Sequence, residues 1–344
     1  MSDLHTSEPP NVTTSESAKF SAARDAVRDL KARMAKSVLG QDRLVESILI
    51  GLLANGNILI ESLPGLAKTR AVKTLAKHLA ADLSRVQFTP DLLPSDIIGA
   101  EIYLQTDKGG QFQFQRGPIF ANLVLADEIN RAPPKVQSAL LEAMEERQVT
   151  VAGKTYKMSD LFMVLATENP IEQEGTYPLP EAQLDRFLMH VVVTYPDDAT
   201  EGEIIKLNRE ENKQKPKPHD AEPPPIPQQA IFAARGEIDD VFVSDLAQKY
   251  IVEVIQATRF PERYGEPLSK WIQIGSSPRG SLALDRCART RAWLDAKDFV
   301  TPDHVRAVMH DCLRHRLILS YEALSQGASA DQVIDKIAEL VAPA

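Results

Sequence analysis

Several residue types are scarce in this chain of 344 residues. It contains only two cysteines, Cys287 and Cys312, without the spacing of metal ligands, so we expect no disulfide framework and a reducing compartment. Lysine and arginine number 39 against 48 aspartates and glutamates, which gives a net charge of −9. Non-specific binding of nucleic acid needs clustered basic residues, so no nucleic-acid partner is expected, although a local basic pore or patch is compatible with this balance.

Long hydrophobic runs are also missing. No segment approaches the roughly twenty apolar residues that a membrane span requires. Residues 1–17 are rich in Ser, Thr, Glu and Pro and lack both a basic start and an apolar core, so they are predicted to form a disordered tail and not a secretory signal. The sequence therefore predicts a soluble, cytoplasmic protein with no membrane span.

The chain contains enough apolar residues to form the cores of two domains. A chain of 344 residues is too long for one ordinary core, and 43% of it is hydrophobic. Apolar residues recur at three- and four-residue steps in 18–36 and in 42–54, which predicts two amphipathic helices. Val38 and Leu39 lie between them, where they either pack against an adenine or only connect the two helices.

A phosphate-binding loop is predicted between the apolar run 57–61 and the helical pattern that follows. The segment 62–69 fits G-x-x-x-x-G-K-[ST], except that Ser62 and Ala67 replace the two glycines. A helix N-terminus offers unpaired N–H donors and the positive end of the helix dipole, so such a loop can wrap an anion. Lys68 would reach the β- and γ-phosphates of ATP, and Thr69 would place its hydroxyl on the bridging Mg²⁺. The predicted nucleotide-binding residues are Val38, Leu39, Pro64, Gly65, Leu66, Ala67, Lys68, Thr69 and Arg70.

The two replaced glycines leave a second interpretation open. On these residues alone, an ordinary strand-to-helix turn with a lysine in its first helical turn also explains the pattern. If the loop does bind ATP, Ser62 is expected to lower the affinity without abolishing binding, because the donors are backbone groups and Lys68 and Thr69 are present.

Polar residues follow two further apolar strands. Residues 123–126 are continuously apolar and lead to Asp127 and Glu128, as in a buried parallel strand that carries acids to the end of the sheet where ligands bind. Asp127 is predicted to hold magnesium through water, and Glu128 to polarise the attacking water. The apolar run 162–167 leads to Asn169, whose amide could orient water against the γ-phosphate. The alternatives are a simple acidic turn for the carboxylates and a turn-forming role for Asn169.

Two β-hairpins and a last strand complete the predicted core. Segments 101–105 and 111–115 alternate around a turn at 107–110, and residues 148–158 form a second hairpin turning at Gly153-Lys154. The first hairpin either projects to touch a substrate or a neighbouring subunit, or is decoration. Residues 189–193 read as the last strand.

The rest of the chain has helical periodicity. Residues 201–212 are helical and charged, 213–229 form a proline-rich linker or exposed loop, and helices follow from 244 onward. The predicted fold is α/β: a parallel sheet core with inserted β-hairpins, followed by a small all-helical domain. The expected boundaries are a tail at 1–17, a core at 18–196 and a helical domain at 197–344 that includes the proline-rich loop.

Together these motifs resemble the MoxR family of AAA+ ATPases, a branch of the P-loop NTPases. The resemblance is strong over 38–196, and in the helical part it rests mainly on two short motifs. The matching segments are Pro64-Gly65-Leu66-Ala67-Lys68-Thr69, the run 126–146 with its Asp127-Glu128 pair, Ala166-Thr167-Glu168-Asn169-Pro170, Pro180-Glu181-Ala182-Gln183-Leu184-Asp185-Arg186-Phe187, Ser277-Pro278-Arg279 and His315-Arg316-Leu317.

The resemblance implies more than the residues alone. It implies a parallel α/β core with a helical lid, assembled in rings, commonly of six, with ATP at the subunit boundaries. It makes Asn169 the sensor asparagine, Arg186 the arginine finger that reaches the neighbour's site, and Arg279 the lid arginine that reports the γ-phosphate. It also implies that both hairpins face the ring pore or an adjacent subunit, and that a partner carries a von Willebrand factor A-type domain.

The predicted activity is ATP hydrolysis, by in-line attack of water that Glu128 activates, with magnesium held by Thr69 and Asp127. The cycle would drive lid motion and remodel, mature or activate a client protein complex in the manner of a chaperone. The alternative is a nucleotide-gated scaffold that binds ATP and assembles but hydrolyses little. A nucleic-acid motor is disfavoured by the acidic composition.

Overall fold

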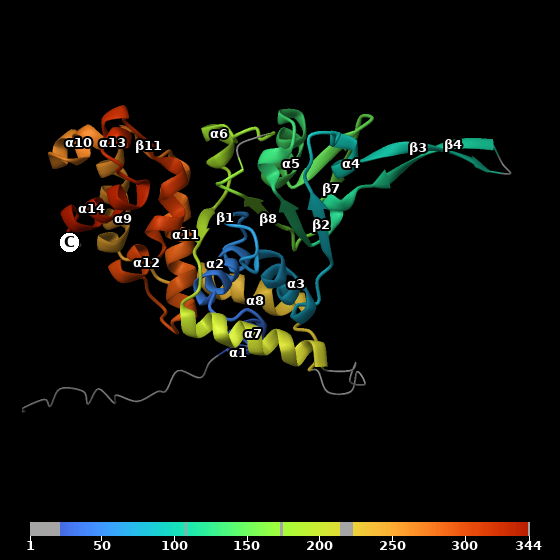
Figure 1. Ribbon diagram of the computed structural model, residues 1–344, viewed down its shortest axis with the longest axis horizontal. Helices are drawn as coiled ribbons and strands as arrows, with labels where there is room; N and C mark the ends of the chain where they lie inside the picture. The colour runs from blue at the N-terminus through green and yellow to red at the C-terminus, as the bar shows by residue number, and fades with distance from the viewer. Residues whose placement is uncertain (1–20, 107–108, 173–174, 214–222, 343–344) are drawn as a thin grey trace, which may run out of the picture.

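The fold is described from a computed structural model of the protein, over residues 21–106, 109–172, 175–213 and 223–342 (Figure 1). The predicted tail at 1–17 lies outside the described residues, as do 214–222 of the proline-rich loop and 107–108 of the first hairpin turn. Within the described ranges, no helix is long and apolar enough to cross a membrane.

A five-stranded parallel sheet with the strand order β2-β5-β8-β1-β9 forms the centre of the molecule. Ile60 of β1 lies opposite Thr167 of β8, so these two strands end at the same edge of the sheet. The predicted site residues follow the strands at this edge. The last strand has the predicted bounds. The strands are β1 (Ile58–Ser62), β2 (Leu83–Gln87), β5 (Leu123–Asp127), β8 (Met163–Glu168) and β9 (Met189–Val193).

Helices cover both faces of this sheet, as the continuous apolar strands require. Leu123 and Leu125 of β5 face one hydrophobic cluster, while Val124 and Ala126 face the other, because successive side chains of a strand point to opposite faces. The first face packs on α1 (Ala22–Ser37), α2 (Asp42–Leu53), α3 (Lys68–His78) and α8 (Gln228–Asp239). The second face packs on α4 (Pro94–Ile98) and α5 (Pro134–Glu146), with the short 3₁₀ turns η1 (Pro118–Phe120) and η2 (Ile129–Arg131).

Both predicted hairpins are present. Strands β3 (Gly99–Thr106) and β4 (Gly109–Arg116) pair antiparallel and project far from the body of the molecule (Figure 1). The second hairpin consists of β6 (Gln148–Val151) and β7 (Lys154–Lys157). Its turn is Ala152-Gly153, one residue earlier than predicted, because Lys154 already pairs with Val151 and both turn residues adopt positive φ angles.

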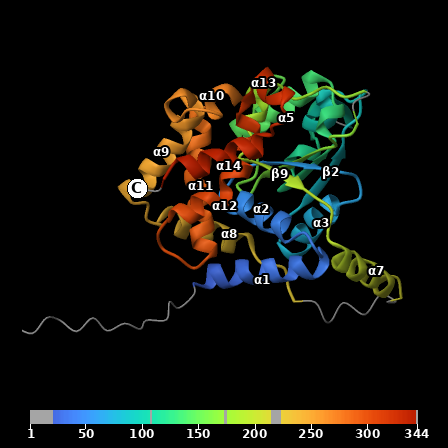
Figure 2. The ribbon, with the colours of Figure 1, turned by 60° about the vertical axis from the view of Figure 1, so that its left-hand side comes forward.

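The C-terminal region is helical, as predicted, but it also contains a short two-stranded sheet. Strands β10 (Ile272–Ile274) and β11 (Ile318–Leu319) pair antiparallel. Figure 2 shows the C-terminal helices packed beside α2 and α8. The remaining elements are α6 (Glu181–Leu184), α7 (Asp198–Lys213), α9 (Asp245–Arg259), η4 (Pro261–Tyr264), α10 (Leu268–Trp271), α11 (Pro278–Leu294), α12 (Pro302–Leu313), η5 (Arg314–Arg316), α13 (Tyr321–Ser325) and α14 (Ala330–Leu340).

The first hydrophobic cluster extends from the sheet into this C-terminal region without a break. It contains Ile58 and Leu165 of the sheet together with Tyr250 of α9, Trp293 of α11 and Ile334 of α14, all of them buried. The domain boundaries expected from the sequence remain a prediction.

Candidate functional site

The predicted phosphate-binding loop connects β1 to the N-terminus of α3. Gly65 has a φ of +87°, and a side chain added there would meet no atom within 4 Å, so the loop is open to the outside. Lys68 is the first residue of α3, and its ammonium donates to the Ser62 carbonyl over 3.2 Å. Burial lowers the pKa of Lys68, against the opposing effect of Asp127 and Glu128. A phosphate group at this loop would therefore compensate a partly desolvated cation.

Ala67 holds an unusual conformation at the end of this loop. Its φ of 56° and ψ of 10° are left-handed, which explains why glycine is the common residue at this position. A left-handed alanine costs about 1–2 kcal/mol relative to its preferred conformations. The sequence alone showed the missing glycine but not whether the loop keeps the glycine-like shape.

We expect Ala67→Gly to increase the free energy of unfolding by up to about 1 kcal/mol, because the relief of strain exceeds the added flexibility of the unfolded chain. Ala76→Gly is the matched control in the regular part of α3, where glycine should cost about 1 kcal/mol. Urea unfolding of both variants measures the difference. Equal losses of stability in the two variants would show that Ala67 is not strained.

A cavity of about 310 Å³ lies beside the loop. Val38 and Leu39 line it and also connect α1 to α2, and packing of an adenine against them stays a prediction. Ile204 and Leu207 of α7 also line this cavity and were not predicted. Their three-residue spacing within a charged helix was the available signal. The other lining residues are Ser37, Gln41, Pro64, Gly65, Leu66, Ala67, Arg70, Tyr195, Pro196, Glu201 and Asn208.

The Asp127 carboxylate is buried at the end of β5 and has two partners. Arg85 donates to one oxygen from Nη2 over 2.7 Å and from Nε over 3.1 Å, and the Thr167 hydroxyl donates to the other over 2.7 Å. The same hydroxyl accepts from the backbone N–H of Glu128 over 2.9 Å. Thr167 thus fixes both acidic residues in relation to β8. Neither Arg85 nor Thr167 was predicted, although Thr167 ends an apolar run at the right end of the sheet.

Glu128 and Asn169 lie at the same end of the sheet, after β5 and β8. Glu128 has a left-handed backbone with a φ of 59°, and its carboxylate accepts from Gln87 over 2.9 Å and from Arg131 over 3.1 Å. Asn169 is buried, and its side-chain oxygen accepts from the backbone N–H of Ile171 over 3.2 Å. Burial raises the pKa of the adjacent Glu168 carboxyl. The predicted water-activating and sensing residues therefore directly follow two neighbouring strands.

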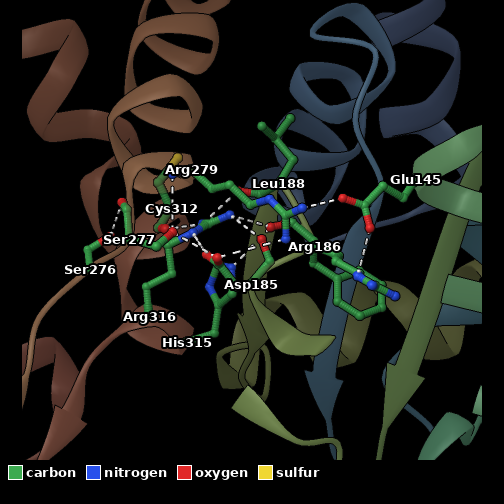
Figure 3. Close-up of polar contacts among 11 residues, drawn as sticks. Glu145, Asp185, Arg186, Leu188, Ser276, Ser277, Arg279, Cys312, His315 and Arg316 are labelled. Carbon is green, nitrogen blue, oxygen red and sulfur yellow. Dashed lines mark hydrogen bonds and ion pairs between the residues drawn. The ribbon is translucent and has the colours of Figure 1, made fainter. Parts of the chain in front are cut away.

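The two arginines that the resemblance singled out lie elsewhere (Figure 3). Arg186 and Arg279 both line a second, polar cavity of about 390 Å³, which receives no residue of the loop 62–70. Both pair with Glu145 at the end of α5: Nε of Arg186 is 2.9 Å from one carboxylate oxygen, and Arg279 bonds the other. Of the predicted loop residues, 64–67 and Arg70 line the first cavity, whereas Lys68 and Thr69, the first residues of α3, are not among its lining residues. Arg186 and Arg279 line the other cavity.

Comparison with known proteins identifies the family. A model of the ATPase family associated with various cellular activities (AAA) matches residues 57–189, and an AAA lid domain model matches 269–337. The chain is also 44% identical to the chaperone MoxR1 of Mycobacterium tuberculosis over 339 residues, covering 97% of this chain and 85% of that protein. This chain belongs to the MoxR family of AAA+ ATPases.

Two further similarities agree with the MoxR assignment. The protein MoxR of Methylorubrum extorquens is 31% identical over 307 residues, covering 86% of this chain and 88% of that protein. A solved structure from Cytophaga hutchinsonii, described as an ATPase, is 42% identical with a TM-score of 0.85 and covers 94% of this chain and 96% of that one. The predicted family and fold class are confirmed.

Proposed function

We propose that this MoxR-type chain hydrolyses ATP at the boundaries between subunits of a ring of six. The arrangement of the two cavities carries the proposal. The loop 62–70 and the arginines Arg186 and Arg279 do not share a cavity within the described chain. Arg70 lines the loop cavity, and a head-to-tail ring interface would let a neighbouring subunit add Arg186 to the site as the arginine finger.

The loop side of the site fits a nucleoside triphosphate. The apolar wall of Val38, Leu39 and Ile204 suits a base, and the open loop beside it suits the phosphates. Lys68 binds the β- and γ-phosphates, while Glu128 orients and deprotonates the attacking water and Asn169 holds that water by its amide. Magnesium, held by Thr69 and Asp127, would neutralise charge on the phosphates.

Remodelling of a protein complex is the output that we propose for this cycle. The relative MoxR1 is named a chaperone, and the C-terminal helices contact the segment that carries Arg186. A change at the nucleotide can therefore reach the C-terminal helices and a bound client. We further propose a partner with a von Willebrand factor A-type domain and a cytoplasmic location, both as the resemblance and the composition indicate.

A second candidate function is a nucleotide-gated scaffold with little hydrolysis. The observation that favours it is the engagement of both acidic residues by arginines: Asp127 pairs with Arg85, and Glu128 pairs with Arg131. If these pairs persist when ATP binds, the carboxylates are not free to serve magnesium and water. ATP would then hold the assembly together without rapid turnover.

The rate of ATP hydrolysis per subunit, measured against protein concentration, tests the proposal. We expect it to rise with concentration together with the mass in solution, determined by light scattering, because each site needs a neighbour. A rate that is independent of concentration and assembly would overturn the shared site. Tight ATP binding and assembly without turnover would favour the scaffold. Stimulation of ATP hydrolysis by DNA or RNA would favour a nucleic-acid motor.

A further inference from the structure

A single arginine of the C-terminal region holds the segment 185–188, which carries Arg186. The Arg316 side chain, in η5, is only 3% exposed. Its guanidinium has five N–H donors, and the structure provides an acceptor for each. Nε donates to the Asp185 carboxylate over 2.8 Å, and Nη2 donates to the carbonyls of Asp185 over 3.1 Å and Phe187 over 2.6 Å. Nη1 donates to the Leu188 carbonyl over 3.2 Å and to that of Cys312.

These acceptors lie on both sides of Arg186. The carbonyls of Asp185 and Phe187 belong to the residues immediately before and after it, and one nitrogen of one planar group binds both. A guanidinium is rigid, so the two carbonyls cannot change their relative orientation while it stays bound. Arg316 therefore sets the direction in which the backbone presents the Arg186 side chain.

Asp185 receives a second set of contacts from α11. The hydroxyl of Ser277, which also caps α11, donates to the other Asp185 oxygen over 2.7 Å, and Arg279 lies 4.0 Å from that oxygen. A ring nitrogen of His315 lies 3.1 Å from the Phe187 carbonyl. Two separate elements of the C-terminal region, α11 and η5, thus converge on the segment that carries Arg186 (Figure 3).

We propose that Arg316, acting through Asp185 and the carbonyls beside Arg186, is a positioning residue that holds the arginine finger in reach of the neighbour's nucleotide. This inference rests on the proposed function. It goes beyond that function by linking the C-terminal helices of one subunit to hydrolysis in the next, since a shift of η5 would move the segment 185–188 that carries the finger.

Mixing two variants tests this role, because a subunit with a defective finger regains activity only from a neighbour whose finger is intact. Arg316→Lys keeps the charge but cannot provide the planar set of five donors. Alone, it should lower ATP turnover at least tenfold while ATP binding to the same chain changes less than twofold. In an equimolar mixture with Glu128→Gln, whose finger is intact, about a quarter of the interfaces combine the intact site of an Arg316→Lys subunit with the intact finger of a Glu128→Gln subunit. Turnover of the mixture should recover to that extent. Mixed with Arg186→Ala, it should not recover.

Three controls separate the possible failures. Arg289→Lys, on α11 but bonded to Asp285 and Asp239, should keep native turnover. Asp185→Asn keeps one oxygen as an acceptor for Arg316, replaces the oxygen that accepts from Ser277 by an amide nitrogen, and loses the charge. It should reproduce the Arg316→Lys pattern in a milder form. The mixture of Arg186→Ala with Glu128→Gln must regain activity; if it does not, the shared site itself is wrong, and the role of Arg316 fails with it.

The remaining outcomes decide the proposal on its own. If Arg186→Ala regains activity when mixed with Glu128→Gln and Arg316→Lys does not, Arg316 does not act through the finger. Native turnover in Arg316→Lys leads to the same conclusion. If both Arg316→Lys and Asp185→Asn fail to assemble by light scattering, the contact is needed to form the assembly and the positioning role is overturned.

Discussion

Arg186→Ala is expected to lower ATP turnover per subunit by about 10³- to 10⁵-fold, the range measured for arginine fingers in related phosphoryl-transfer sites. The finger stabilises charge that develops on the transferred phosphoryl group, so its removal should slow the chemical step. The loop cavity does not include Arg186, so ATP binding by the same subunit should change little. Phosphate release under saturating ATP and binding of a fluorescent ATP analogue give the two measurements.

The stability of this variant should be almost unchanged. Arg186 shares Glu145 with Arg279, and both charges of the Arg186–Glu145 pair are about one third exposed, so its loss costs about 0–1 kcal/mol and leaves Glu145 with a partner. A large drop in the free energy of unfolding would mean that any loss of turnover reports misfolding. A loss of turnover below about tenfold, with the fold intact, would remove Arg186 from the role of finger.

Glu128→Gln is expected to lower turnover by about 10²- to 10⁴-fold, since an amide of the same shape cannot accept the proton of the attacking water. ATP should still bind, because Glu128 contacts Gln87 and Arg131 and lies outside the loop. The amide oxygen can accept from the same two donors, so the local geometry should persist. Single-turnover hydrolysis separates the chemical step from ATP binding and product release.

Glu142→Gln is the matched control for this substitution. Glu142 is an exposed carboxylate on α5, and its replacement removes the same charge from the chain without touching the end of the sheet. Its turnover should equal that of the native chain. If Glu128→Gln hydrolyses ATP as fast as Glu142→Gln, another group must activate the water, and if it fails to bind ATP, Glu128 has a structural role instead.

Local patterns were sufficient to predict most of the sheet and its loop. Residues 189–193 form β9 as predicted, because its residues are mostly apolar or β-branched and Met189, Val191 and Val193 are buried on one face. The positions of the loop at Ser62–Thr69 and of the two carboxylates at the end of β5 were predictable, because each follows an apolar run that ends at a definite residue. The turn at Ala152-Gly153 was misplaced by one residue, since the pairing of Lys154 with Val151 depends on the partner strand.

The contacts between distant segments were beyond local patterns. Nothing in the sequence around Glu145 indicates that Arg186 and Arg279 both pair with it, because that contact requires α5, the segment after α6 and α11 to meet. The short β10–β11 sheet depends likewise on residues far apart in the chain. The sequence places Arg85 only in a strand, whereas the structure shows its guanidinium bonded to Asp127 on the neighbouring strand.

The hydrophobic cluster that extends from one face of the sheet into the C-terminal helices has a consequence for how the chain melts. Buried side chains from Ile58 to Ile334 share one cluster, so loosening either part exposes apolar surface on the other. Thermal denaturation of the monomer should then be a single cooperative transition. The segment 57–189, which matches the AAA model, would be unstable and prone to aggregation on its own. The C-terminal helices are in this sense a thermodynamic part of the nucleotide-binding unit.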